Sequence, residues 1–296
     1  MRDTFSQLHP VVNFLYFGLV LAFSMFLMHP VCLSVSLFCA VFYSFCLKGK
    51  KVLRFQVRYL LPLLLFTAVL NPVFNHEGGT ILAYFPSGNP LTLEAVAYGV
   101  ATAVMLASVL SWFTCYNAVM TSDKFVYLFG RMIPALSLIL SMTLRFVPRM
   151  KTQIKRVAEA QKCTGRGLSS GSLLQKAGNG ARIFSIAVTW ALENAIDTAD
   201  SMKSRGYGLE GRTAFSIYRF DGRDKGVLLF LLFSGVYLAA GALLGGFQVR
   251  YFPTIKAIGL EPYTASLFLC YLALGLCPVV INMKEDRKWK ALQSKI

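Results

Sequence analysis

The chain has 296 residues, of which 55% are hydrophobic and only 15% are charged. Soluble domains carry about 25% charged residues, so this composition excludes an ordinary water-soluble enzyme, a disordered chain and a secreted disulfide scaffold. Thirty Lys and Arg against fourteen Asp and Glu give a net charge of +16, and the placement of that charge along the chain is informative about membrane topology.

Six apolar runs are candidate transmembrane helices, because a span needs about 20 predominantly apolar residues. The runs lie at residues 11–28, 31–47, 59–74, 93–119, 226–246 and 263–282. Only His29 and Pro30 separate the first two runs, which predicts a tight helical hairpin, since proline ends one helix and can open the next. We therefore expect an all-α integral membrane protein with about six spans. The expected regions are a four-span part at 1–120, a cytoplasmic part at 121–225, and a two-span part with a basic tail at 226–296.

Basic residues gather on one side of this six-span arrangement. Twenty-eight of the thirty lie at the N-terminus, at 48–58, at 121–225 or beyond residue 283. Loops rich in Lys and Arg stay in the cytoplasm, so both termini are expected to be cytoplasmic and the first run to be retained as a span. The same asymmetry accounts for the net charge without nucleic acid, and aromatic residues are not interleaved with the basic ones as a nucleic-acid surface would require.

The cytoplasmic part, 121–225, is too long to be a plain loop and must fold. Apolar residues recur at three- and four-residue intervals over 150–161 and over 184–202, which predicts two amphipathic helices. In the first helix, Lys155 and Glu159 are spaced to form an i,i+4 ion pair. The polar face of the second helix carries Glu193, Asp197 and Asp200.

Both predicted helices end in similar short segments, Gly165-Arg166-Gly167 and Ser204-Arg205-Gly206, at a constant offset of 39 residues. One interpretation is a helix C-cap, in which glycine adopts the left-handed conformation and a cation suits the negative helix end. A cap alone would accept lysine equally and does not require repetition. The other interpretation is a cap that also presents arginine to a partner, because the guanidinium group binds a carboxylate through two parallel hydrogen bonds.

Small residues at helical spacing are candidates for docking a second membrane subunit, because they let helices approach closely. The alternative is packing within the chain's own bundle. The residues are Ala95, Gly99 and Ala103 in the fourth span and Ala187, Ala191 and Ala195 in the second cytoplasmic helix. The spans carry almost no charged side chains, which disfavours a proton-driven transporter. The seven cysteines and three histidines show no metal-ligand spacing, so no metal site is expected in this chain.

Several motifs in order resemble the transmembrane T component of energy-coupling factor transporters, the family that includes the cobalt-transport permease CbiQ. They are Leu8-His9-Pro10, Asn71-Pro72-Val73-Phe74, Leu144-Arg145-Phe146-Val147-Pro148 and the two arginine motifs. The resemblance covers most of the chain. Gly165 and Ser204 stand where the family usually has alanine, and an arginine often found in the fourth span has no counterpart at 100–111.

The resemblance implies a scaffold subunit, not an enzyme, in an ATP-driven importer of a prokaryotic cell membrane. In that family, the T component joins two cytoplasmic ABC-type ATPases, identical or different, to one small membrane subunit that captures a vitamin or a transition-metal ion. The chain itself would carry no cofactor, and ATP and Mg would be bound by the ATPases. Arg166 and Arg205 would each insert into a groove of one ATPase. The chain contains no P-loop of the form GxxxxGK[ST], as this division of labour requires.

Two other classes are open on the sequence. An ordinary ABC permease subunit would form the pathway itself, but it would need one coupling motif per subunit rather than two. An intramembrane lipid-modifying enzyme would need clustered carboxylates to hold a divalent ion, and the acidic face around Asp197 and Asp200 is the only candidate on a predicted helix.

Overall fold

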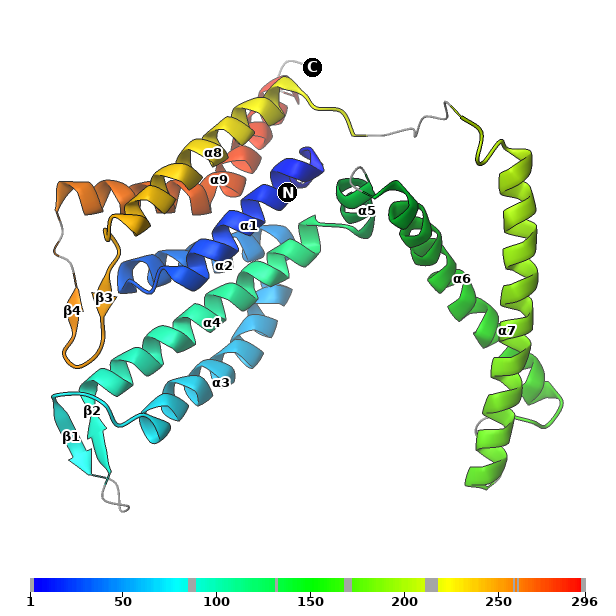
Figure 1. The fold of residues 1–296 in the computed structure, drawn as a ribbon, viewed down its shortest axis with the longest axis horizontal. Coiled ribbons are helices and arrows are strands. Elements are labelled where there is room, and N and C mark those ends of the chain that lie inside the picture. The colour runs from blue at the N-terminus through cyan, green and yellow to red at the C-terminus, as the bar shows by residue number, and fades with distance from the viewer. Residues whose placement is uncertain are drawn as a thin grey trace. The chain divides into compact units, whose positions relative to one another are not determined.

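The structure is a computed structural model that describes residues 3–84, 89–130, 133–167, 172–210, 218–257, 259 and 261–293. The chain divides into two compact units. The bundle unit comprises Met1–Thr121 and Tyr218–Ile296, and the arm unit comprises Ser122–Ile217. Helices dominate both units (Figure 1), as the all-α prediction requires.

The described part of the bundle unit consists of long helices and two short strand hairpins. Its elements are the 3₁₀ helix η1 (Phe5–Gln7), α1 (Pro10–Phe26), α2 (Pro30–Lys48), α3 (Lys50–Phe74), β1 (Ile81–Tyr84), β2 (Pro90–Thr92), α4 (Leu93–Val119), α8 (Gly222–Leu243), β3 (Val249–Arg250), β4 (Lys256–Ala257) and α9 (Pro262–Gln293).

Five helices among the described residues are long and apolar enough to cross a membrane. They are α2, the Gln56–Phe74 part of α3, α4, α8 and α9. The remaining predicted span, the run at 11–28, corresponds to α1, which is apolar but has only 17 residues. Its length is about 26 Å at 1.5 Å per residue, slightly less than the hydrocarbon thickness of about 30 Å. The six predicted runs therefore correspond to five full-length spans and one shorter helix.

Helices α1 and α2 begin in the same way, with a histidine before the first-turn proline. His9 Nδ1 accepts a hydrogen bond from the Val11 N–H at 3.3 Å, and His29 Nδ1 accepts one from the Val31 N–H at 3.3 Å. These bonds satisfy backbone donors that have no partner within the helix. The predicted break between the first two runs at His29 is therefore confirmed.

The basic segment at 48–58 is helical rather than a loop. Helix α2 ends at Lys48, and α3 begins at Lys50. Gly49 makes the turn between them with a φ of +67°, a backbone conformation that favours glycine. The basic residues of this segment therefore lie at the end of α2 and in the first few turns of α3.

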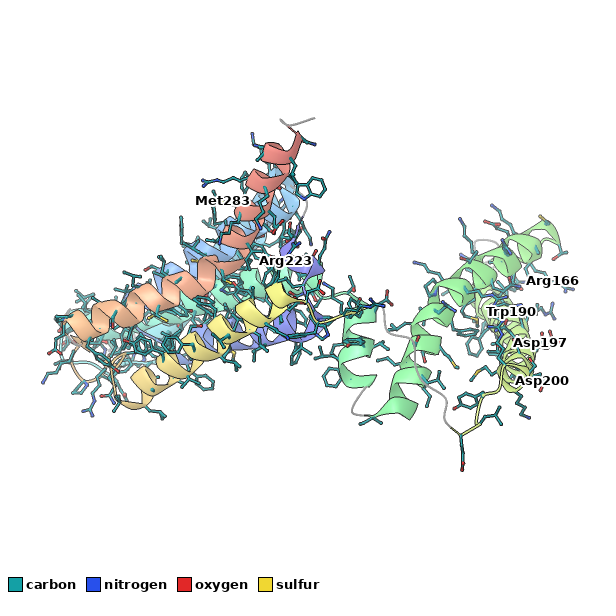
Figure 2. The ribbon with its side chains drawn as sticks, turned by 90° about the horizontal axis from the view of Figure 1, so that it is seen from above. Arg166, Trp190, Asp197, Asp200, Arg223 and Met283 are labelled. Atoms are coloured by element: carbon teal, nitrogen blue, oxygen red, sulfur yellow. The ribbon has the colours of Figure 1, made fainter. Side chains whose placement is uncertain are left out.

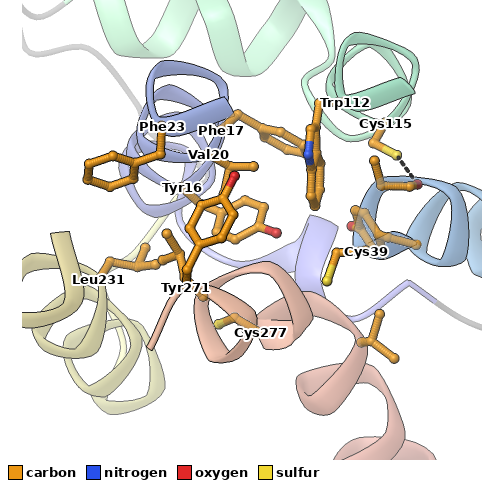
Figure 3. Packing of buried hydrophobic residues seen from close by; sticks show 14 of the residues in the cluster. Tyr16, Phe17, Val20, Phe23, Cys39, Trp112, Cys115, Leu231, Tyr271 and Cys277 are labelled. Atoms are coloured by element: carbon orange, nitrogen blue, oxygen red, sulfur yellow. Dashed lines mark hydrogen bonds between the residues drawn. The ribbon is translucent and has the colours of Figure 1, made fainter. Parts of the chain in front are cut away.

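The core of the bundle unit contains large aromatic side chains (Figure 3) and a buried hydrogen-bond network beside them. Trp112 is completely buried, and its Nε1 donates to Ser36 Oγ at 3.1 Å. Ser24 Oγ lies 2.7 Å from Ser36 Oγ and 3.2 Å from the Tyr271 hydroxyl. The network thus joins α1, α2, α4 and α9, and such polar contacts hold helices together where lipid offers no hydrogen bonds.

The two strand hairpins lie at the same end of the bundle (Figure 1). Both are antiparallel, and the Gly79 N–H donates to the Pro253 carbonyl at 3.0 Å. Glu94, in the first turn of α4, is only 2% exposed. Its carboxylate accepts from the Thr80 hydroxyl at 2.8 Å and from the Thr80 N–H at 3.2 Å, so the buried charge is satisfied locally.

The described part of the arm unit contains α5 (Ser122–Gly130), α6 (Pro134–Cys163) and α7 (Leu173–Ser204). The two long helices correspond to the two predicted amphipathic helices, but both begin earlier than the apolar pattern indicated. Pro134 opens α6, and proline at a first helical position is favourable. A capping box between Ser172 and Gln175 opens α7.

Candidate functional site

Helices α6 and α7 pack as an antiparallel pair. Near the end of α6, the Gly167 carbonyl accepts a hydrogen bond from Asn179 Nδ2 of α7 at 3.2 Å. In the middle of α6, the Phe146 ring stacks on the Trp190 ring of α7 with centroids 6.0 Å apart. As the residue numbers of the contacts increase along α7, those of their partners in α6 decrease, so the two helices are antiparallel.

The first arginine motif forms a Schellman cap at the end of α6. Gly165 has a φ of +78°, the Gly165 N–H donates to the Lys162 carbonyl at 3.1 Å, and the Arg166 N–H donates to the Gln161 carbonyl at 3.0 Å. These are the two hydrogen bonds that define this cap. Arg166 follows the left-handed glycine directly.

The second motif forms the same cap with the arginine in a different place. Gly206 has a φ of +78°, the Gly206 N–H donates to the Lys203 carbonyl at 2.9 Å, and the Tyr207 N–H donates to the Met202 carbonyl at 3.0 Å. Here Arg205 precedes the left-handed glycine. The two caps superpose Gly165 on Gly206, an offset of 41 residues, whereas the sequence repeat aligned the arginines at 39. The motifs are alike in composition and differ in backbone register.

Both arginine side chains are exposed, and no described acidic side chain of the chain pairs with either guanidinium group. Figure 2 shows Arg166 near the end of the helix pair. The first motif is tied to α7 at Asn179, and Arg205 lies 26 residues further along the same helix. At 1.5 Å per residue, the two motifs are separated by about 39 Å along α7. Arg166 therefore lies just beyond the end of α6, beside the Asn179 part of α7, and Arg205 lies at the far end of α7.

The face of α7 that packs on α6 contains larger residues than the small ones predicted for docking. Ile183 is 5% exposed and Ala187 is fully buried, with Trp190 half-buried on the same face. Ala191 is half-buried and Ala195 is exposed. A row at four-residue spacing turns by about 40° per step, because a helix has 3.6 residues per turn, so the row drifts out of the helix interface. Ile183 and Trp190 were not among the predicted site residues, although both fit the same three- and four-residue spacing.

The arm unit exposes a large apolar surface. On α7, four residues at successive four-residue intervals are between 37% and 67% exposed: Phe184, Val188, Leu192 and Ile196. On α6, a hollow is lined by Phe146, Val147, Met150, Lys151 and Ile154. Exposed apolar surface of this extent marks a site of interaction with another molecule.

The small residues predicted for docking in α4 are buried in the chain's own bundle. Ala95 is fully buried and Ala103 is 1% exposed. A Cβ on Gly99 would lie 2.6 Å from the Ala68 carbonyl oxygen of α3, so glycine allows α3 and α4 to approach closely. Packing within the bundle thus accounts for these three positions, and a docking role for them stays a prediction.

The charged faces of the arm unit are solvated. The predicted Lys155–Glu159 ion pair is confirmed, with Nζ and Oε1 3.9 Å apart and both side chains exposed. Glu193, Asp197 and Asp200 are exposed along α7 (Figure 2 labels the two aspartates). Within the residues that the structure describes, no group of three His, Cys, Asp or Glu side chains could hold a metal ion.

Comparison with known proteins gives a consistent result. The family described as "Cobalt transport protein", CbiQ, matches residues 2–215. The energy-coupling factor transporter transmembrane protein EcfT of Exiguobacterium sibiricum is 26% identical over 227 residues, which cover 72% of this chain and 86% of that protein. The protein of the same name from Brevibacillus brevis is 29% identical over 207 residues, covering 62% of this chain and 76% of that protein. The protein of that name from Lactobacillus helveticus is 27% identical over 198 residues, covering 62% of this chain and 69% of that protein.

Proposed function

The chain belongs to the cobalt transport protein (CbiQ) family, and we propose that it works as the transmembrane component of an energy-coupling factor transporter. In this role the chain is a scaffold in the membrane. It joins two cytoplasmic ABC-type ATPases, which bind ATP and Mg, to one membrane subunit that captures the substrate. That substrate is a vitamin or a transition-metal ion.

The observation that carries this proposal is the pair of exposed arginine caps, one at the end of α6 and the other at the end of α7. Each guanidinium group is free to enter a groove of one ATPase and to bind a carboxylate there through its planar fork. A separation of about 39 Å along a straight helix suits two separate protein surfaces rather than one. The caps fix the backbone at each tip, so less conformational freedom is lost when a partner binds.

Two tips on one chain favour this assembly over an ordinary ABC permease. A permease that dimerises around its own pathway needs a single coupling element per chain. Here one chain offers two ATPase contacts, and their different backbone registers are compatible with identical or different ATPases.

The substrate-capturing subunit is proposed to dock on the exposed apolar row of α7. Removing apolar surface from water stabilises a complex by about 25 cal/mol per Å². The row offers four exposed apolar side chains for this purpose: Phe184, Val188, Leu192 and Ile196. Ala191 and Ala195 border this row and allow a partner helix to approach closely. The basic residues of the arm unit and of the tail support a cytoplasmic location for these parts and for both termini in a prokaryotic cell.

Affinity purification of the chain from its own cells, with partners identified by mass spectrometry, tests both contacts at once. Replacing Arg166 and Arg205 together with alanine is expected to remove the ATPases, because each lost arginine leaves a carboxylate unpaired at a cost of about 3–5 kcal/mol. Leu192→Glu is expected to remove the small membrane subunit and to leave the ATPases bound.

Arg182→Ala is the matched control, since Arg182 is another exposed arginine of α7. It is expected to leave all partners in place. Retention of both ATPases by the double arginine variant would overturn the coupling proposal. Loss of every partner from Leu192→Glu would overturn the assignment of separate surfaces.

A further inference from the structure

Trp190 of α7 contacts two residues of α6 that lie one helical turn apart. The Phe146 ring stacks on it with an interplanar angle of 15° and centroids 6.0 Å apart. The Arg149 guanidinium carbon lies 5.6 Å from the centroid of the Trp190 ring, within the range of a cation–π interaction. One indole side chain therefore holds both ends of a single turn of α6.

That turn contains Pro148, which lies inside α6. Proline has no N–H, so the helix lacks one backbone hydrogen bond here, and the proline ring crowds the preceding turn. This is where a long helix bends most readily. Trp190 bridges the weak point from the side, with Phe146 before the proline and Arg149 after it.

Beyond this contact, α7 continues as a helix whose side chains are mostly exposed. Every described side chain from Ala195 to Ser204 is exposed except the half-buried Met202. The part of α7 from Trp190 to Ser204 is about 21 Å long at 1.5 Å per residue. A small change of angle at Trp190 would therefore move Arg205 by several ångströms, and the side chain at this point sets where the tip lies.

We propose that Trp190 is a positioning residue that locks the angle between α6 and the Arg205 end of α7 through its joint contact with Phe146 and Arg149. The lock makes the two arginine tips move as one rigid body, so movement of the ATPases is passed on as a rotation rather than absorbed at the proline. The consequence for coupling rests on the proposed function. The lock itself is a property of this chain alone.

Pulsed electron paramagnetic resonance on the full-length chain in lipid nanodiscs measures the lock directly. One spin label is placed on Cys163, which is exposed, and another on Lys203→Cys. Serine replaces the half-buried Cys46 and Cys270, and the other four cysteines are buried. Because the end of α6 lies beside Asn179, the two labels are about 36 Å apart along α7. If the angle between α6 and α7 is fixed, the distance distribution between the labels is narrow.

Trp190→Leu is expected to widen this distribution at least about twofold, because leucine keeps apolar bulk but offers neither a stacking face nor a cation–π face. Trp190→Phe retains both faces and is expected to restore the narrow distribution, which a general loss of packing would not explain. Arg149→Gln keeps the stacked rings and is expected to give an intermediate width. Trp289→Leu, at an exposed position of α9, is the control and leaves the width unchanged.

A distribution for Trp190→Leu as narrow as that of the wild type would overturn the proposal, and so would a Trp190→Phe variant as wide as Trp190→Leu. Circular dichroism confirms that each variant keeps its helices before the distances are compared. The measurement uses no partner subunit, so its result is independent of whether the ATPases bind at Arg166 and Arg205.

Discussion

The bundle unit and the arm unit use similar helices for opposite purposes. In the bundle unit, Trp112, Tyr16 and Tyr43 are fully buried, and hydrogen bonds between side chains link four helices. Among the described side chains of the arm unit, the buried residues are Lys124, Gly167, Ile183 and Ala187. The bundle unit is thus closed on itself, whereas the arm unit leaves most of its apolar surface open.

This difference indicates where each unit obtains its stability. A lipid-embedded bundle gains little from hydrophobic contact between helices and relies on close packing and interhelical hydrogen bonds. The arm unit has a narrow seam between α6 and α7, and its remaining apolar surface is available for partners. Mutations in the two units are therefore expected to have different consequences.

The largest effect is expected from Trp112→Ala in the bundle unit. The change removes a fully buried side chain and leaves Ser36 without the indole donor, for an expected loss of about 3–5 kcal/mol. The folded fraction measured on titration from a mild detergent into SDS reports this loss. Trp190→Leu in the arm unit is expected to leave the same transition unchanged, and an equal loss in both variants would contradict the division into two independently stabilised units.

A moderate effect is expected at the seam of the arm unit. Ala187→Leu places a larger side chain where the structure has no space and is expected to cost about 1–3 kcal/mol. Ala195→Leu, two turns further along the same helix, adds the same bulk at an exposed position and is expected to change stability by less than about 0.5 kcal/mol. Hydrogen exchange of the α6 and α7 amides distinguishes the two. Equal exchange rates in both variants would show that the seam is not tightly packed.

The smallest effect is expected from His9 at the start of α1. Burial lowers the pKa of His9 below its usual 6.5, although the neighbouring Asp224 carboxylate acts in the opposite direction. The neutral ring accepts the Val11 N–H, so protonation removes the cap. Because the unfolded chain binds the proton more readily, this contribution is fully present above pH 6.5 and is lost as the pH falls from there towards the lower pKa of the folded state.

The expected size of the His9 effect is about 1 kcal/mol, typical of an N-cap. His9→Asn keeps a capping acceptor and has no titration in this range, so the stability difference between variant and wild type isolates this residue. A difference that does not change between pH 7.5 and pH 5 would rule out the titration of His9 as its cause.

The sequence predicted the features that depend on local pattern. Runs of about 20 apolar residues located the spans, and the His29-Pro30 break located the hairpin, because both signals lie within a few turns of one helix. The same is true of the Lys155–Glu159 pair. The starts of α6 and α7 were missed: α6 already begins at Pro134 and α7 at the capping box of Ser172, well before the predicted segments 150–161 and 184–202.

Features that depend on contact between distant segments could not be predicted. The network of Ser24, Ser36, Trp112 and Tyr271 joins residues up to 247 positions apart, and nothing in the local pattern distinguishes these serines from others in the spans. In the candidate site, the two arginine motifs were found correctly as repeated segments. Their backbone register was not predicted, because two similar sequence motifs can form the same cap with their arginines two residues apart relative to the cap glycine.

That register has a consequence for selectivity. The left-handed glycine lies before the guanidinium-bearing residue at one tip and after it at the other, so the two side chains leave otherwise equivalent scaffolds at non-equivalent positions. If each arginine enters a groove of one ATPase, as proposed, a constrained peptide that mimics one cap would present its arginine wrongly for the groove that receives the other. Under the proposed function, the two grooves could then be blocked one at a time, and a transport assay would reveal whether one bound ATPase is sufficient for turnover.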